Sequence, residues 1–264
     1  MIELIWIEYL VLFILGTMAG SFLNVIIYRV PDGASIAFPA SHCLHCGRPI
    51  KPWENIPVIS YIFLRGKCKG CKVHISFQYP LVEISMGLLV AFMHFAFGFS
   101  WDFVIYSVLA GLLLALSVID LKTYRLPDPI TMTGAIMAVA LTLLLRREFW
   151  LQMLLGGAVG VGVMGLQGLI GMLIMKSVAK KGGTLGLGDV KFAGMIGLFL
   201  GPGRTGGMYI FAIFLGAIFG LTMIALGGRR FGQKIPFGPY IAAGALVSLV
   251  WGEHIWRWYS SFLR

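Results

Sequence analysis

Charged residues are scarce in this chain: they make up 12% of its 264 residues, whereas hydrophobic residues make up 58%. Soluble domains carry about a quarter charged residues, so this scarcity excludes an ordinary soluble protein. Several windows reach the roughly 20 apolar residues that cross a bilayer. We predict an all-α polytopic membrane protein with about eight transmembrane helices, at 7–28, 81–99, 103–119, 129–145, 151–175, 191–201, 207–226 and 237–252.

Acidic residues are fewer than basic ones, 11 against 21, which gives a net charge of +10. When the loops are assigned alternately from an outside N-terminus, 16 Lys and Arg residues fall inside and five outside. That bias follows the positive-inside rule, so the basic excess indicates topology. We therefore expect the lipid bilayer, and no nucleic acid, among the partners.

The N-terminus carries Glu3 and Glu8, and no basic residue precedes the first apolar run. A secretory signal peptide needs a positive segment there, so we predict an uncleaved first helix within 1–29. A polar stretch at 30–79 then interrupts the apolar pattern, and long connections of this kind usually carry function. We predict three parts: the first helix at 1–29, a cytoplasmic insertion at 30–79 and a membrane core at 80–264.

The segment 191–201 is the shortest of the expected spans and contains three glycines, one of them at its end. A full crossing needs more residues, so a re-entrant or broken helix is the alternative here. Such a helix is tolerated only where protein or a cavity surrounds it.

Cysteine is rare, and all four cysteines lie in the insertion as two C-x-x-C pairs about twenty residues apart: Cys43, Cys46, Cys68 and Cys71. This spacing predicts a structural zinc site with four thiolate ligands, with Gly47 and Gly70 in the tight turns. A closed four-cysteine site leaves no position for water, so we expect no catalytic role for the metal. The alternatives are two disulfides, which a reducing compartment disfavours, free thiols, and a mixed ligand set with the nearby histidines His42, His45 and His74.

Two of the few acids stand at the expected cytoplasmic face. Asp120 ends the apolar run "LLLALSVID", and Asp189 lies in "GGTLGLGDVK" before the next apolar run. Each could simply pair with a neighbouring base, Lys122 or Arg125 for the first and Lys191 for the second. Taken singly, either aspartate would more often have this ordinary role. Ionisable residues at membrane depth still favour a functional hypothesis, and two carboxylates held close at matching depth share a proton. The pair therefore predicts aspartic-protease chemistry without a metal.

The sequence resembles the type IV prepilin peptidases, the leader peptidase / N-methyltransferase family. The resemblance covers nearly the whole chain and is carried by the two C-x-x-C pairs and by these segments: "GSFLNVIIYRVP" (20–31), "ENIPVISYIFLRGKC" (54–68), "QYPLVE" (78–83), "IDLKTYRLPD" (119–128), "GLGDVK" (186–191) and "PFGPY" (236–240).

The resemblance implies that Asp120 and Asp189 are the catalytic pair. Asp128 is the acid most easily confused with Asp120, and we expect it to cap the helix that begins near Pro129. It implies cleavage of prepilins or type II secretion pseudopilins after a glycine, at the cytoplasmic face of the bacterial inner membrane. It also implies methylation of the new N-terminal amine with S-adenosylmethionine. The sequence assigns no residue to that donor; Glu54 and Glu83 are candidates, although a loop salt bridge with Lys51 or Arg65 and a helix N-terminal acid explain them more simply.

Four other functions compete with this interpretation. The chain could be a peptidase without methyl transfer, or an intramembrane protease of the presenilin type. It could also be a proton-coupled transporter that uses both aspartates, or a scaffold whose zinc module binds a partner. The transporter is disfavoured because the sequence has no internal repeat and no matched pair of broken helices.

Overall fold

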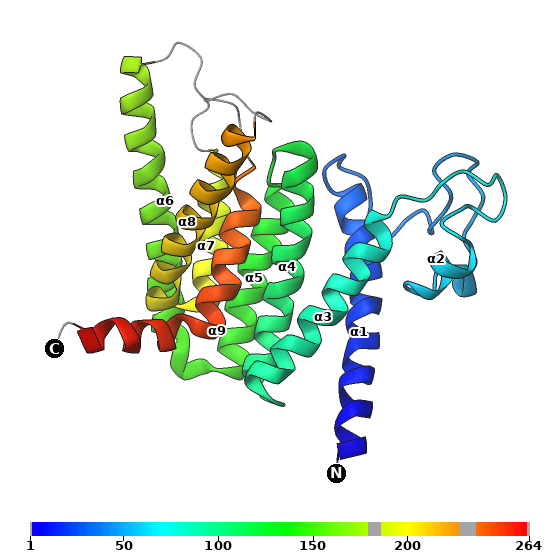
Figure 1. Ribbon diagram of the computed structural model, residues 1–264, viewed down its shortest axis with the longest axis horizontal. Helices are drawn as coiled ribbons and strands as arrows, with labels where there is room; N and C mark the ends of the chain where they lie inside the picture. The colour runs from blue at the N-terminus through cyan, green and yellow to red at the C-terminus, as the bar shows by residue number, and fades with distance from the viewer. Residues whose placement is uncertain (1, 179–185, 227–235, 263–264) are drawn as a thin grey trace. The chain divides into compact units, whose positions relative to one another are not determined.

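The computed structural model describes residues 2–178, 186–226 and 236–262 (Figure 1). The start of the "GGTLGLGDVK" loop and several of the basic residues assigned to the inside, among them Arg229 and Arg230, lie outside these residues. The described parts form the helices α1 (Ile2–Arg29), α2 (Ile59–Phe63), α3 (Gln78–Phe97), α4 (Trp101–Thr123), α5 (Asp128–Leu145), α6 (Trp150–Val178), α7 (Leu187–Leu200), α8 (Pro202–Ala225) and α9 (Gly238–Phe262), with short 3-10 turns at Pro52–Glu54 and Arg147–Phe149.

The chain divides into two compact units, Met1–Ala115 and Leu116–Arg264. The first unit contains α1, the insertion with α2, α3 and most of α4. The second contains the end of α4 and the helices α5 to α9. Asp120 and Asp189 both belong to the second unit, and all four cysteines belong to the first.

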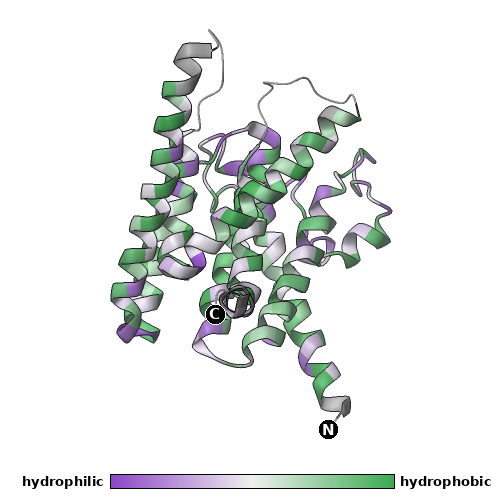
Figure 2. Cartoon of the chain, turned by 60° about the vertical axis from the view of Figure 1, so that its left-hand side comes forward, coloured by the Kyte–Doolittle hydropathy of each residue, from purple (hydrophilic) through white to green (hydrophobic). Residues whose placement is uncertain are grey.

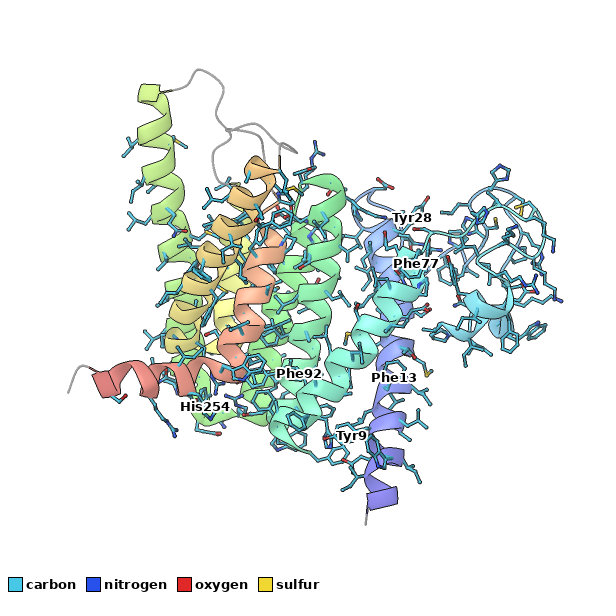
Figure 3. The ribbon with its side chains drawn as sticks, viewed as in Figure 1. Tyr9, Phe13, Tyr28, Phe77, Phe92 and His254 are labelled. Carbon is cyan, nitrogen blue, oxygen red and sulfur yellow. The ribbon has the colours of Figure 1, made fainter. Side chains whose placement is uncertain are left out.

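In the first unit, α1 packs along α3 at very short range. A Cβ atom added to Gly20 would come within 2.7 Å of the Cα of Glu83, and one added to Gly16 within 2.7 Å of the Cα of Gly87. Small residues allow helix backbones to approach in this way inside a membrane. Phe13 of α1, labelled in Figure 3, lies against the same glycine of α3, Gly87.

The opposite end of α3 carries a buried histidine, His94, which is 7% exposed. Its Nε2 contacts the carboxylate of Glu8 on α1. Three rings surround it, those of Tyr9, Phe99 and Phe103; Figure 3 labels Tyr9 on α1. This polar contact fixes α1 to α3 at the end away from the insertion.

The second unit is organised around α7, which packs against α5, α6, α8 and α9. Eight of the 14 residues of α7 are buried. The backbones of α6 and α7 are in direct contact: a Cβ atom on Gly156 would strike the carbonyl of Gly197, and one on Gly160 the carbonyl of Ala193. The Tyr209 hydroxyl of α8 also donates a hydrogen bond of 2.5 Å to the Gly160 carbonyl.

Within the described residues, six helices are long and apolar enough to cross a membrane: Ile5–Arg29, Gln78–Phe97, Trp101–Thr123, Asp128–Leu145, Arg147–Leu173 and Pro202–Met223. Hydrophobic residues cover these helices along their length in Figure 2. The polytopic α-helical class is confirmed, but the predicted count of eight is not, because α7 and α9 are not among the six. At about 1.5 Å per residue, α7 is only about 21 Å long, shorter than the roughly 30 Å hydrocarbon core.

Candidate active site and metal centre

Asp120 lies in the last turn of α4 and is 5% exposed. The backbone N–H of Gly238, at the start of α9, donates a hydrogen bond of 2.8 Å to its Oδ2. A Cβ atom on Gly238 would stand 2.8 Å from the same oxygen, so a larger residue there would displace the carboxylate. The segment "PFGPY" thus holds Asp120, a role that sequence reasoning did not assign to it.

Asp189 lies in the first turn of α7 and is half-buried. Its Oδ2 accepts a hydrogen bond of 3.1 Å from the N–H of Gly186. An acid in the first turn also suits the positive end of the helix dipole. The preceding residue, Gly188, brings α7 against the α4–α5 connection: a Cβ atom there would lie 3.3 Å from the Cβ of Leu126.

The second unit brings the two predicted aspartates together. Asp120 and Asp189 are close enough for their charges to interact. Three segments that are far apart in the sequence converge there: the end of α4, the start of α7 and the start of α9. Two carboxylates in such an arrangement can share one proton and act as an acid–base pair.

The neighbouring base Lys191 does not neutralise the pair. Its Nζ lies 2.7 Å from the Oδ2 of Asp128, in the first turn of α5. Asp128 is the first residue of that helix, and the capping position before it is occupied by Pro127 without a side-chain cap. The prediction that Asp128 caps α5 is therefore wrong. Instead, its carboxylate ties the α4–α5 connection to α7, two residues from Asp189.

The four cysteines of the insertion converge on one point. Their four sulfur atoms all lie within 4.8 Å of one another, and the Sγ atoms of Cys43 and Cys71 are 3.8 Å apart. All four are free thiols, so the disulfide alternative is not the state of this structure. This group could hold a metal ion.

The two knuckles have the same backbone geometry. In the first, Gly47 has φ of 68° and its N–H donates to the Cys43 carbonyl at 2.9 Å. In the second, Lys72 has φ of 61° and its N–H donates to the Cys68 carbonyl at 3.0 Å. The left-handed position of the second knuckle thus falls on Lys72, while Gly70 lies within the tight turn of that knuckle, as predicted.

Backbone donors inside the knuckles act on the sulfur atoms. The N–H groups of Cys46 and His45 point at the Cys43 thiol and lower its pKa to about 6. At Cys71 the Val73 N–H acts to lower the pKa of the thiol. Desolvation and hydrogen bonds with the other thiols outweigh it and raise that pKa to about 11. A thiolate is the form that binds metal, and these donors favour it at Cys43.

Glu54 has a structural role in the insertion. Its Oε1 lies 3.0 Å from the Arg48 guanidinium and 3.4 Å from the Lys69 ammonium. The hydrogen bond from Arg48 holds the pKa of Glu54 down at about 2. The predicted loop salt bridge is present, but with these partners rather than with the Lys51 ammonium or Arg65; Lys51 contributes only its backbone N–H, at 3.4 Å.

Glu83 of α3 is buried at 7% exposure. Its Oε2 accepts a hydrogen bond of 2.7 Å from the N–H of Val58 in the insertion. Glu83 is five residues inside α3, so it is not an acid of the helix N-terminus. It joins the insertion to the membrane part of the first unit.

The fold and this site together define a multi-pass helical membrane protein with a pair of interacting carboxylates and a four-cysteine module. Two family models match the chain: the bacterial peptidase A24 N-terminal domain over residues 14–97 and the type IV leader peptidase family over residues 107–221. No solved structure matches.

Curated relatives match over almost the whole chain. A prepilin leader peptidase/N-methyltransferase of Stutzerimonas stutzeri is 37% identical, over 95% of this chain and 93% of the relative. The proteins of the same name from Pseudomonas aeruginosa and Bacillus subtilis are 34% and 32% identical, over 94% of this chain and 92% and 96% of theirs. The chain belongs to this family of proteases, and the predicted resemblance is confirmed.

Proposed function

We propose that this protein cleaves the leader of type IV prepilins or type II secretion pseudopilins after a glycine, and then methylates the new N-terminal amine. The observation that carries the peptidase half is the convergence of Asp120 and Asp189 in the second unit. The relatives named above carry both activities in their name, which supports the methyl-transfer half.

In the proposed cleavage, the two aspartates share one proton. The ionised carboxylate takes a proton from a water molecule, whose oxygen forms a bond to the scissile carbonyl carbon. The protonated carboxyl donates its proton to the carbonyl oxygen. The C–N bond then breaks, the leaving amine takes up a proton from the pair, and the tetrahedral centre collapses to the glycine carboxyl group as one of its hydroxyls returns a proton to the pair. Hydrogen bonds from Gly238 and Gly186 hold one oxygen of each aspartate in place during these steps.

We place this site at the cytoplasmic face of the bacterial inner membrane, with the N-terminus outside. The support is the bias of basic residues toward one set of loops and the position of both aspartates at helix ends. A substrate with a basic leader and an apolar helix in the membrane presents its cleavage point at this interface. The presenilin-like alternative requires a motif deep within a helix, whereas Asp189 lies in the first turn of α7.

We propose zinc as the metal of the four-cysteine module. A tetrahedral site with Zn–S bonds of about 2.3 Å places its sulfur atoms about 3.8 Å apart. The Sγ atoms of Cys43 and Cys71 already have this separation. Four thiolates fill the coordination sphere, so the ion would join the two knuckles and stabilise an insertion that has few buried apolar residues.

The methyl-transfer half requires S-adenosylmethionine, which supplies an electrophilic methyl group. Transfer forms an N–C bond at the new amine while the S–C bond of the donor breaks, and it releases a thioether and one proton. The N-terminal family model covers residues 14–97, separate from the peptidase match at 107–221. This separation supports two activities in different parts of the chain.

Intact mass spectrometry of a co-expressed prepilin tests the proposal. The native protein should yield a product without leader that carries one added methyl group. Asp120→Asn and Asp189→Asn should each leave the precursor uncut, because neither amide can take a proton from water. Asp32→Asn, which changes an exposed loop acid, should process normally. Cleavage that persists in both dyad variants would favour the transporter or the scaffold instead.

A further inference from the structure

A groove of about 400 Å³ lies in the first unit, beside the cytoplasmic end of α1 that Tyr28 marks in Figure 3. One wall is a single face of α1 that includes Ser21, Val25 and Arg29, and the other wall comes from the insertion segments 36–41 and 55–57. This volume lies within the roughly 300–1,000 Å³ of small-molecule sites. The groove is separate from the dyad, which belongs to the second unit.

The lining combines apolar and polar groups. Met18 and Phe22 are exposed along the α1 wall, at 56% and 53%. Arg29 closes one end, where its guanidinium donates hydrogen bonds to the carbonyls of Ser35 (2.9 Å) and Pro39 (2.8 Å). A guanidinium has five donors, so these two bonds leave it able to bind a carboxylate as well.

The insertion wall is held in an unusual backbone conformation. Val58 has φ of 61° and ψ of −51°, and the N–H of Ile59 donates to the carbonyl of Pro57 at 2.5 Å. This is a γ-turn with positive φ at a β-branched residue, which is rare and strained. Strained backbone of this kind persists where its surroundings fix it, and it is concentrated at ligand sites.

Glu83 connects this turn to the groove. The buried carboxylate accepts the Val58 N–H at 2.7 Å, and it lies close to the side chain of Ser21, which lines the groove. One turn further along α1, Asn24 is 3% exposed; its Nδ2 donates to the Tyr79 carbonyl at 3.0 Å, and its Oδ1 accepts no bond from the described residues. Two buried polar side chains, Glu83 and Asn24, therefore lie behind the α1 residues that line the groove.

We propose that this groove binds the methyl donor, a nucleoside that carries an amino acid on a sulfonium centre. The proposal rests on the methyl-transfer half of the proposed function. Arg29 would bind the amino-acid carboxylate, the ring of Phe22 would cover the base, and the Ser21 hydroxyl would accept from a donor of the ligand while Glu83 orients it. All of these residues lie within 14–97, the part of the chain that matches the N-terminal family model.

Binding can be measured directly on the full-length protein in detergent micelles, by equilibrium dialysis with S-adenosylhomocysteine. Val25→Trp should fill the groove and raise the Kd at least tenfold, while prepilin cleavage by the same preparation stays at the native rate. Ser21→Ala should raise the Kd several-fold. The matched control is Leu10→Trp, which adds the same ring at a 58% exposed position of α1 outside the groove and should bind as the native protein does.

The outcomes separate the two proposals. Native affinity and native methylation in Val25→Trp would overturn the groove assignment and leave the methyl-transfer function standing. A native protein that cleaves prepilin but neither binds the probe nor adds a methyl group would overturn the methyl-transfer function, and the groove assignment with it. If Val25→Trp loses cleavage as well, Ser21→Ala decides, and native affinity in that variant would overturn the assignment.

Discussion

Replacement of Gly238 by alanine tests the geometry of the dyad without touching either carboxylate. The new Cβ atom would stand 2.8 Å from Oδ2 and 3.2 Å from Cγ of Asp120, closer than such atoms approach. Either the carboxylate or the start of α9 must move, and the hydrogen bond of 2.8 Å from Gly238 is then broken or lengthened. A hydrogen bond to a charged group contributes about 1.5–3 kcal/mol, which corresponds to roughly a 10–100-fold loss in rate.

We expect Gly238→Ala to lower kcat for prepilin cleavage by about 10–100-fold, measured with purified enzyme in detergent, with little change in KM. Gly203→Ala is the matched control: the same change at the start of α8, where an added Cβ meets no atom within 4 Å. Binding of S-adenosylhomocysteine should stay native in both variants, because the groove lies in the other unit. A Gly238→Ala enzyme that cleaves at the native rate would refute the view that this contact sets the position of Asp120.

Three further predictions concern the supports of the two sites. Asp128→Asn and Lys191→Met should each slow cleavage by only a few-fold, because their ion pair is exposed and exposed ion pairs contribute about 0–1 kcal/mol. A double-mutant cycle on kcat should show that the two effects are coupled. Fully additive effects would contradict a role of this ion pair in holding α7 against the α4–α5 connection. Cys43→Ser should lower the zinc content and make the insertion sensitive to limited proteolysis, with methylation lost before cleavage; a metal-free variant that still methylates would contradict this. The hydrogen bond from Arg48 lowers the pKa of Glu54 in the folded protein from 4.5 to about 2, so the stabilisation of the insertion by Glu54 is present above pH 4.5 and is lost as the pH falls toward 2. Limited proteolysis of the insertion should therefore rise with acid in the native protein and rise less steeply in Glu54→Gln. Parallel curves of proteolysis against pH for the two proteins would contradict this role of Glu54.

The sequence predicted the class of fold and the convergence of the cysteines because both depend on local patterns. Apolar length identifies a spanning helix within one segment, and the C-x-x-C spacing lets both thiolates of a knuckle reach one ion. The proximity of Asp120 and Asp189 was inferred from two things, their similar expected depth in the membrane and the resemblance to the family. The structure supports it.

The contacts that hold these residues could not be predicted, because they join distant segments. Nothing local to "PFGPY" shows that the Gly238 N–H faces Asp120, and nothing near Val58 shows that a carboxylate 25 residues further along holds its N–H. The left-handed conformation of Lys72 was also missed, because a lysine, unlike the glycine at the same place in the first knuckle, does not favour positive φ. The lesson is that a repeated hydrogen-bond pattern outweighs residue preference at such a position.

The shortness of α7 has a consequence for the effect of lipid on the enzyme. Spanning helices adjust to bilayer thickness by tilting, and α4, which carries Asp120 in its last turn, is long enough to respond in this way. Helix α7 has no such hydrophobic length to match, and α6 fixes it by backbone contact. A change in acyl-chain length that tilts α4 relative to α6, itself a spanning helix, would therefore move Asp120 relative to Asp189, so membrane thickness would become a variable in the spacing of the pair.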